Sequence, residues 1–249
     1  MSLEMAMSRM SGESIHVAVY YEALCSDSVY FITRQLYPNY QLFKDHMTVE
    51  FIPYGKAIVS GTFTTLFDTT NKLYVFLSYI FNNFDIDTLQ HTFDNTTGKY
   101  TFSCQHGKEE CKGNKFQACG LAQIANEEER LDFVTCVMSA SNPANIFYLE
   151  NCAKKSTLDF SAMTKCAISS EGDKLLASYG DKTWNLEPNL SYVPTVVFNH
   201  SVEINFSDMN KSLVDFKSVM CSKIEQNHPD VCKSRSFMSR IKQFFSQQF

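Results

Sequence analysis

IHVAVYYEALCSDSVYFITRQLYP, residues 15–38, is the stretch that decides the fold. Residues 15–21 are apolar and mostly β-branched or aromatic, which predicts a buried strand. A short turn then leads to Cys25. From Val29 onward the apolar residues recur at helical spacing, so we expect a helix that begins just after Cys25 and ends at Pro38. The pattern therefore predicts a cysteine at the start of a helix that follows a strand.

Cys25 is the first candidate for a reactive residue. The start of a helix carries partial positive charge and unpaired N–H groups, and both favour a thiolate over a thiol. The alternative is that Cys25 is a small buried apolar residue, as free cysteines often are. Ser28 occupies the position where a dithiol redox motif has its second cysteine, and its hydroxyl is a candidate hydrogen-bond donor to the Cys25 thiolate.

Composition limits the classes of function. The chain has 249 residues and is 44% hydrophobic, enough for one large domain or a domain with an insertion. A net charge of −5 argues against nucleic acid as a partner. The longest apolar run is far shorter than the ~20 residues of a transmembrane helix. None of the nine cysteines forms a CxxC pair, which argues against a zinc ribbon or finger.

The cysteines and sequons indicate an oxidising compartment. Eight of the nine cysteines can pair in an order that the sequence leaves open, and Cys25 is the natural one to remain free. Five acceptor sequons for N-glycosylation accompany them, at Asn95, Asn189, Asn199, Asn205 and Asn210. Together they favour a protein of the secretory pathway. Residues 1–14 contain no apolar run, so we expect a disordered lead in which no signal peptide is visible.

Residues 59–90 differ in composition from the rest of the chain and form an atypical insert. They are rich in Phe, Leu, Thr, Tyr, Asn and Ile. One interpretation is a hairpin or helix that packs on the core or on a partner. The other is a retained intron, because Val59-Ser60 can be encoded by GTAAGT and Leu89-Gln90 by TTGCAG, the usual intron boundaries.

The remaining elements are predicted from periodicity. Residues 47–53 alternate as a second strand, parallel to the first through a right-handed crossover. Further strands are expected at 192–198 and, after a hairpin turn, at 202–206. Helices are expected at 120–140, 147–152, 158–169 and 171–179, and a last helix capped by Ser207 or Asp208. Cys221 and Cys232, at the end of that helix, are candidates to pair with each other.

Residues 104–119, CQHGKEECKGNKFQAC, form the densest motif. They match CQHGxxECxxNxxxxC at every fixed position, namely Cys104, Gln105, His106, Gly107, Glu110, Cys111, Asn114 and Cys119. This run resembles the signature of the gamma-interferon-inducible lysosomal thiol reductase (GILT) family. YYEALC at 20–25 and Tyr-Val-Pro at 192–194 look like the same family, and the likeness runs from about residue 17 to 232, apart from the insert.

The resemblance implies an α/β fold, thioredoxin-like, with a disulfide-stapled helical insertion. The domain would span 15–232, with the signature and insertion at 99–185, a return to the core fold at 192–226 and a basic tail at 233–249. Members of the family are lysosomal or secreted and reduce protein disulfides through a CxxC pair. By resemblance, Cys25 is the first cysteine of that pair, Ser28 replaces the second, and Pro194 is the cis-proline that faces the thiol.

The missing cysteine changes the expected chemistry. A lone thiolate can still form a mixed disulfide with a protein substrate, but release then requires an external thiol such as glutathione or cysteine, with no other cofactor. The competing interpretation is a secreted, catalytically impaired protein that acts by binding another protein, and a third is a disulfide from Cys25 to another chain. His106 is either a general base or a residue that fixes a turn. We expect no metal, because His106 and the cysteines around it lack a short chelating spacing.

Overall fold

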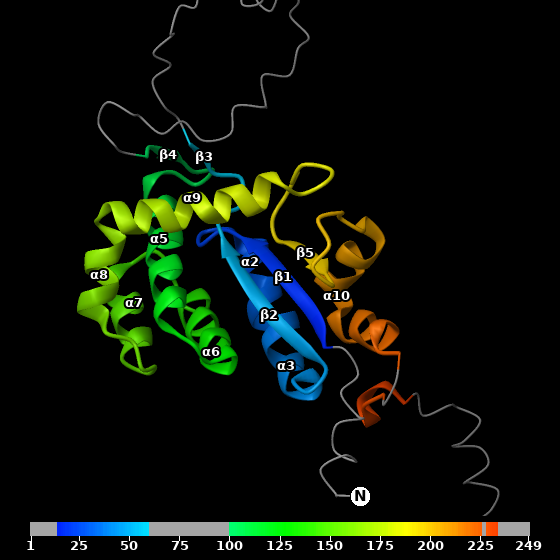
Figure 1. Ribbon diagram of the computed structural model, residues 1–249. Coiled ribbons are helices and arrows are strands. Elements are labelled where there is room, and N and C mark those ends of the chain that lie inside the picture. The colour runs from blue at the N-terminus through cyan, green and yellow to red at the C-terminus, as the bar shows by residue number, and fades with distance from the viewer. Residues whose placement is uncertain (1–13, 60–99, 226–227, 234–249) are drawn as a thin grey trace, which may run out of the picture.

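The computed structural model describes residues 14–59, 100–225 and 228–233, and its centre is a small mixed sheet (Figure 1). Strands β1 (Ile15–Tyr21), β2 (Met47–Pro53) and β5 (Thr195–Phe198) lie in the order β2-β1-β5. β1 pairs parallel with β2 and antiparallel with β5. The strands predicted at 15–21 and 47–53 are confirmed. The predicted α/β class is confirmed as well, because helices join and flank this sheet of one parallel and one antiparallel strand pair.

The crossover from β1 to β2 is helical from residue 26 to residue 43. It consists of α2 (Ser26–Tyr30), the π-helical segment η1 (Phe31–Leu36) and α3 (Tyr37–Phe43). The prediction that Pro38 ends the helix is wrong. Pro38 lies in the first turn of α3, where its missing N–H needs no partner, because the π-helical turn shifts the hydrogen-bond register just before it.

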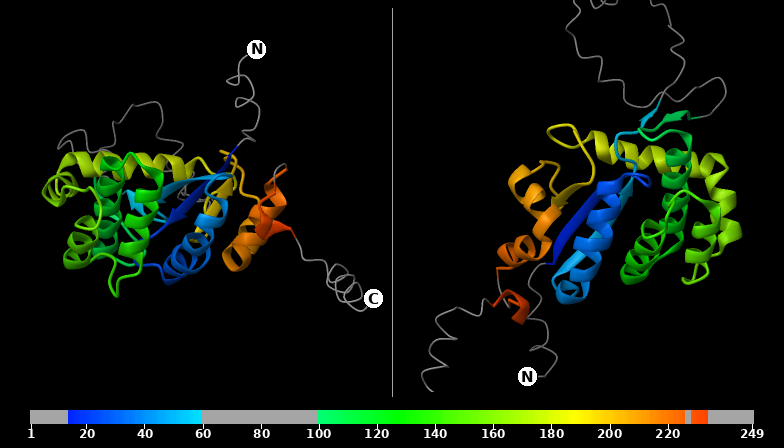
Figure 2. Two further views of the ribbon diagram at one scale, coloured as in Figure 1. Left: turned by 90° about the horizontal axis from the view of Figure 1, so that it is seen from below. Right: turned by 180° about the vertical axis from the view of Figure 1, so that it is seen from behind.

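A helical insertion lies on the β2 side of the sheet, opposite α10 (Phe206–Lys223) (Figures 1 and 2). It contains α5 (Lys108–Gln123), α6 (Glu127–Met138), α7 (Ile146–Ala153), α8 (Phe160–Ala167) and α9 (Ser170–Trp184). Beside it, β3 (Ile58–Val59) pairs with β4 (Phe102–Ser103), and η2 (Asp230–Cys232) follows α10. No helix in the described ranges is both long enough and apolar enough to cross a membrane.

The single helix predicted at 120–140 is instead the end of α5 and the whole of α6. The side chain of Asn126 accepts the Glu129 N–H at 2.9 Å and caps α6. The acidic run at 127–129 therefore forms the first turn of α6, where the helix dipole favours negative charge.

Four disulfides involve every cysteine except Cys25, and all nine lie in the described ranges. Cys119–Cys166 joins α5 to α8, and Cys136–Cys152 joins α6 to α7. Closing loops with sequence separations of 47 and 16 is worth about 3–4 kcal/mol each in the chain-entropy account. The expected stapling of the insertion is confirmed, as are the Cys221–Cys232 pair and the free state of Cys25.

The strand predicted at 202–206 is absent. In this segment Glu203 alone forms a bridge, with Glu187 rather than with β5. The strand does not form because α10 begins there. Asn205 accepts the Asp208 N–H at 3.2 Å and caps α10 at the position where the strand would have ended. The cap of the last helix is thus Asn205, not Ser207 or Asp208.

A charged contact ties α9 to the sheet and predicts a pH effect. The Glu50 carboxylate lies 3.5 Å from His16 Nε2 and pairs with Lys182, and these partners, His16 first, lower the pKa of Glu50 to about 2. A lowered carboxyl pKa stabilises the fold above its ordinary value of 4.5, and this contribution is lost as the pH falls toward about 2. Because the Glu50 side chain is 35% exposed, we expect Glu50→Gln to cost only about 1 kcal/mol at neutral pH.

Urea unfolding from neutral to strongly acidic pH checks this prediction. The stability difference between Glu50→Gln and the parent chain should be constant down to about the ordinary carboxyl pKa and should then shrink. Glu150→Gln, which removes an exposed pair with Lys154, is the control and should change stability by less than about 0.5 kcal/mol. A difference that grows on acidification contradicts the assignment.

Candidate active site

Cys25 lies where the turn after β1 enters α2, as its N-cap residue. Its N–H donates to the Glu22 carbonyl at 3.3 Å, and its Sγ donates to the Val193 carbonyl at 3.6 Å. Val193 precedes Pro194, and the bond between them is cis. The structure thus brings together Cys25 and Pro194, two residues that are far apart in sequence. Cys25 is 8% exposed, so a substrate has access to only a small part of it.

Ser28 has a different local role from the one expected. It is fully buried in the first turns of α2, and its Oγ accepts the Glu22 N–H at 3.4 Å. Within the described ranges no hydrogen bond joins Ser28 to Cys25, so the serine braces the turn rather than the thiol.

Three buried polar side chains on α5 form a stripe that faces the turn before Cys25. Glu110, Asn114 and Gln117 follow one another at helical spacing and have no exposed surface. Asn114 Oδ1 accepts the Ala23 N–H at 2.8 Å, and Gln117 Oε1 accepts the Tyr21 hydroxyl at 2.7 Å. The signature helix therefore holds the end of β1 and the turn that carries the thiol.

Gly113 allows this close approach of α5. A Cβ at this position would lie 2.9 Å from the Cβ of Ala23 and 3.0 Å from that of Ala144, closer than packed side chains come. Sequence reasoning missed Gly113 and Gln117, which are not fixed positions of the motif. The signal that could have found Gln117 is the run of polar residues at helical spacing, which would be unusual on a buried face unless they were hydrogen-bonded.

The rest of the signature shapes the entrance to α5. Gly107 has a φ of +82° and is the N-cap residue of α5, inside the loop closed by Cys104–Cys111. His106 donates its backbone N–H to Glu110 Oε1 at 3.0 Å, and its Nδ1 lies 2.6 Å from Glu110 Oε2. Gln105 is exposed.

Glu22 completes a cluster with His106 and Glu110. Its Oε2 lies 3.4 Å from His106 Nδ1, and its Oε1 accepts the Lys56 N–H at 2.8 Å. Burial raises the pKa of Glu22 above its ordinary value, while the bond from Lys56 acts in the opposite direction. Sequence reasoning did not single out Glu22.

Four of the five sequon asparagines lie in the described residues. Asn189, Asn199, Asn205 and Asn210 are exposed, although Asn205 caps α10 and Asn210 accepts a hydrogen bond from the Tyr192 hydroxyl. Asn95 lies outside the described residues. The insert predicted at 59–90 lies outside them too, apart from its first residue.

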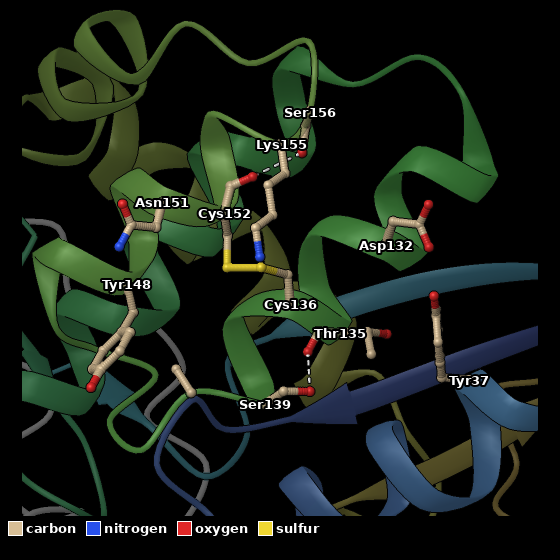
Figure 3. A pocket seen from close by; sticks show the side chains of 11 residues that line it. Tyr37, Asp132, Thr135, Cys136, Ser139, Tyr148, Asn151, Cys152, Lys155 and Ser156 are labelled. Atoms are coloured by element: carbon tan, nitrogen blue, oxygen red, sulfur yellow. Dashed lines mark hydrogen bonds between the residues drawn. A yellow bond between two sulfur atoms is a disulfide. The ribbon is translucent and has the colours of Figure 1, made fainter.

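A cavity of about 600 Å³ lies elsewhere, between α3, α6 and α7 (Figure 3). The Cys136–Cys152 disulfide is part of its wall, and Tyr37, Asp132 and Lys155 also line it. Neither Cys25 nor Pro194 lines this cavity, so the free thiol is not reached through it.

Asn114→Ala tests the role of the signature helix. It leaves the buried Ala23 N–H without its acceptor, so we expect a loss of about 1–3 kcal/mol in the free energy of unfolding and a changed alkylation rate of Cys25. Urea unfolding and iodoacetamide kinetics measure the two effects. Lys112→Ala, an exposed change on the same helix, should alter neither. Parent-like values for Asn114→Ala would show that the turn is held without Asn114.

Comparisons with known proteins agree with the sequence motif. Residues 16–72 and 64–156 match the family model described as gamma interferon inducible lysosomal thiol reductase. GILT-like protein 1 of Drosophila melanogaster is 27% identical over 91% of this chain and 81% of that protein. The gamma-interferon-inducible lysosomal thiol reductase-like protein of Anopheles gambiae is 30% identical over 84% and 77%. A crystal structure from Nitrosomonas europaea aligns with a TM-score of 0.43 at 15% identity, over 76% of this chain and 86% of that one.

Proposed function

Because the chain belongs to the gamma-interferon-inducible lysosomal thiol reductase family, we propose that it is a thiol–disulfide oxidoreductase that acts on protein disulfides through Cys25 alone. The observation that carries this proposal is the state of Cys25. It is the one cysteine outside a disulfide, and its sulfur contacts the carbonyl that precedes Pro194. Ser28, where a second thiol would be needed, is a hydroxyl.

The cycle that these residues support has three exchanges. The Cys25 thiolate attacks one sulfur of the substrate disulfide, a bond to Cys25 forms, and the other sulfur leaves as a thiolate that takes a proton from water. An external thiolate then attacks the Cys25 sulfur and releases the substrate as a thiol. A second external thiolate then attacks the sulfur of the small molecule that is bound to Cys25. Cys25 leaves as a thiolate, and the two small molecules are joined in a disulfide. The two electrons come from the external thiols, with glutathione or cysteine as the reductant.

The fold positions the Cys25 sulfur more than it activates it. Cys25 is the N-cap residue of α2, but its side chain makes no cap hydrogen bond to the N–H groups at the start of that helix. The Val193 carbonyl accepts the S–H of the resting thiol and holds the sulfur beside Pro194. Four disulfides and exposed sequons support a lysosomal or secreted location, where a small reductant must be supplied.

A second candidate is a secreted protein that binds another protein. The serine at position 28 and the low exposure of Cys25 favour it. Insulin reduction at acidic pH, with glutathione varied from none to excess, separates the two. Turnover that rises with glutathione and vanishes without it supports the monothiol enzyme, whereas rates equal to those of glutathione alone support the binding protein.

A further inference from the structure

Three possible ligand atoms converge where the turn after β1 meets the start of α5. They are Glu22 Oε2, His106 Nδ1 and Glu110 Oε2, and all lie within 4.8 Å of one another. His106 Nδ1 is 2.6 Å from the Glu110 oxygen and 3.4 Å from the Glu22 oxygen. Two ligands of one tetrahedral ion lie about 3.3 Å apart, so the His106–Glu22 pair already has this spacing and the His106–Glu110 pair would have to open by less than about 1 Å.

The Glu22 carboxylate is directed into this cluster, and one of its oxygens lacks a hydrogen-bond partner there within the described part of the chain. Its side chain is 1% exposed, and among the described residues its Oε2 has no hydrogen-bond partner. The turn after β2 fixes this orientation, because the Lys56 N–H binds Oε1 and a Cβ on Gly55 would lie only 2.1 Å from Glu22 Cγ. A buried carboxylate oxygen without a partner is costly, so the site favours an added positive ligand.

The charges of the cluster also favour a bound cation. Glu22 and Glu110 are both fully buried, and His106 can supply at most one positive charge. One negative charge therefore remains unbalanced within the cluster when both carboxylates are ionised. A divalent ion would balance both.

We propose that Glu22, His106 and Glu110 form a binding site for a divalent transition-metal ion, with Zn²⁺ as the best match. An imidazole nitrogen with two carboxylate oxygens is a donor set that zinc takes at about 2.0–2.2 Å, whereas magnesium and calcium prefer oxygen alone. The ion would replace the direct contact between His106 Nδ1 and Glu110 Oε2. Three protein ligands leave a coordination position for water.

The site lies next to the redox residue without including it. The Glu22 carbonyl accepts the Cys25 N–H, so an ion on the Glu22 side chain would fix the turn that leads to the thiol. The spacing of His106 from the cysteines around it did not indicate a metal. His106 and Glu110 are four residues apart, but the third ligand arrives only through folding.

Zinc titration of the full chain tests the proposal. Cys25→Ala serves as the parent, because it removes a thiol that would itself bind zinc, and a chromophoric chelator competes for Zn²⁺ at neutral pH. We expect one equivalent to bind, and Glu22→Gln and His106→Gln each to weaken binding at least about tenfold. Glu109→Gln, an exposed neighbour paired with Lys112, should bind as the parent does.

Thermal unfolding with and without Zn²⁺ gives the second measurement. The ion should raise the melting temperature of the Cys25→Ala chain and leave that of the two ligand variants unchanged. His106 is 40% exposed, so its variant is expected to fold even if Glu22→Gln does not. No saturable binding by the parent, or binding that persists in a folded ligand variant, overturns the proposal.

Discussion

Cys25→Ala is expected to lower protein disulfide reduction to the rate of the external thiol alone. Cys25 is the only cysteine not held in a disulfide, so no other sulfur of the chain can form the first mixed disulfide. The effect should be loss of all catalysed turnover, measured by insulin reduction with glutathione in excess.

A matched variant separates the thiol from its packing. Cys25→Ser keeps a donor of similar size beside the Val193 carbonyl, so we expect parent-like unfolding in urea together with the same absence of turnover. Mass spectrometry of the parent chain after acid quenching should find the substrate attached to Cys25. Turnover in either variant would assign the activity to another sulfur, such as one released from the Cys104–Cys111 disulfide.

The parts of the site that depend on residues close together in the sequence could be predicted. A strand, a turn and a cysteine before a helix lie within one short stretch, and the structure confirms each of them. The free state of Cys25 also followed from counting, because an odd number of cysteines leaves one unpaired. That Pro194 lies against Cys25 came from the resemblance to a family, because no local pattern connects residues so far apart.

The parts that escaped prediction depend on tertiary contacts. Asn114 was identified only as a fixed position of the motif and Gln117 was not identified, because their role as hydrogen-bond acceptors appears only when α5 packs against the end of β1. Pro38 was expected to end a helix, but a π-helical turn preceded it and let the helix continue. Residues 202–206 alternate like a strand, yet the cap at Asn205 decides the structure there. At residues 202–206 a competing hydrogen bond therefore outweighed the local pattern.

Ser28→Cys is expected to free the reaction from its dependence on external thiol in the release step. A thiol on the same helical turn as Cys25 would attack the mixed disulfide intramolecularly, at an effective concentration far above that of millimolar glutathione. Under limiting glutathione we therefore expect release of substrate at least about tenfold faster than in the parent. The substitution should be tolerated, because Ser28 Oγ makes a single 3.4 Å bond to the Glu22 N–H, whose loss costs about 1 kcal/mol.

The control for this gain is a thiol at the wrong spacing. Ser26 is exposed and adjacent to Cys25, so Ser26→Cys adds the same chemistry without the geometry of position 28. Single-turnover kinetics with a quenched fluorescent disulfide should show fast release for Ser28→Cys alone, and mass spectrometry should find its two sulfurs joined after turnover. If release by Ser28→Cys still scales with glutathione, then the thiol at position 28 does not reach the mixed disulfide, and the proposed role of the missing cysteine is overturned.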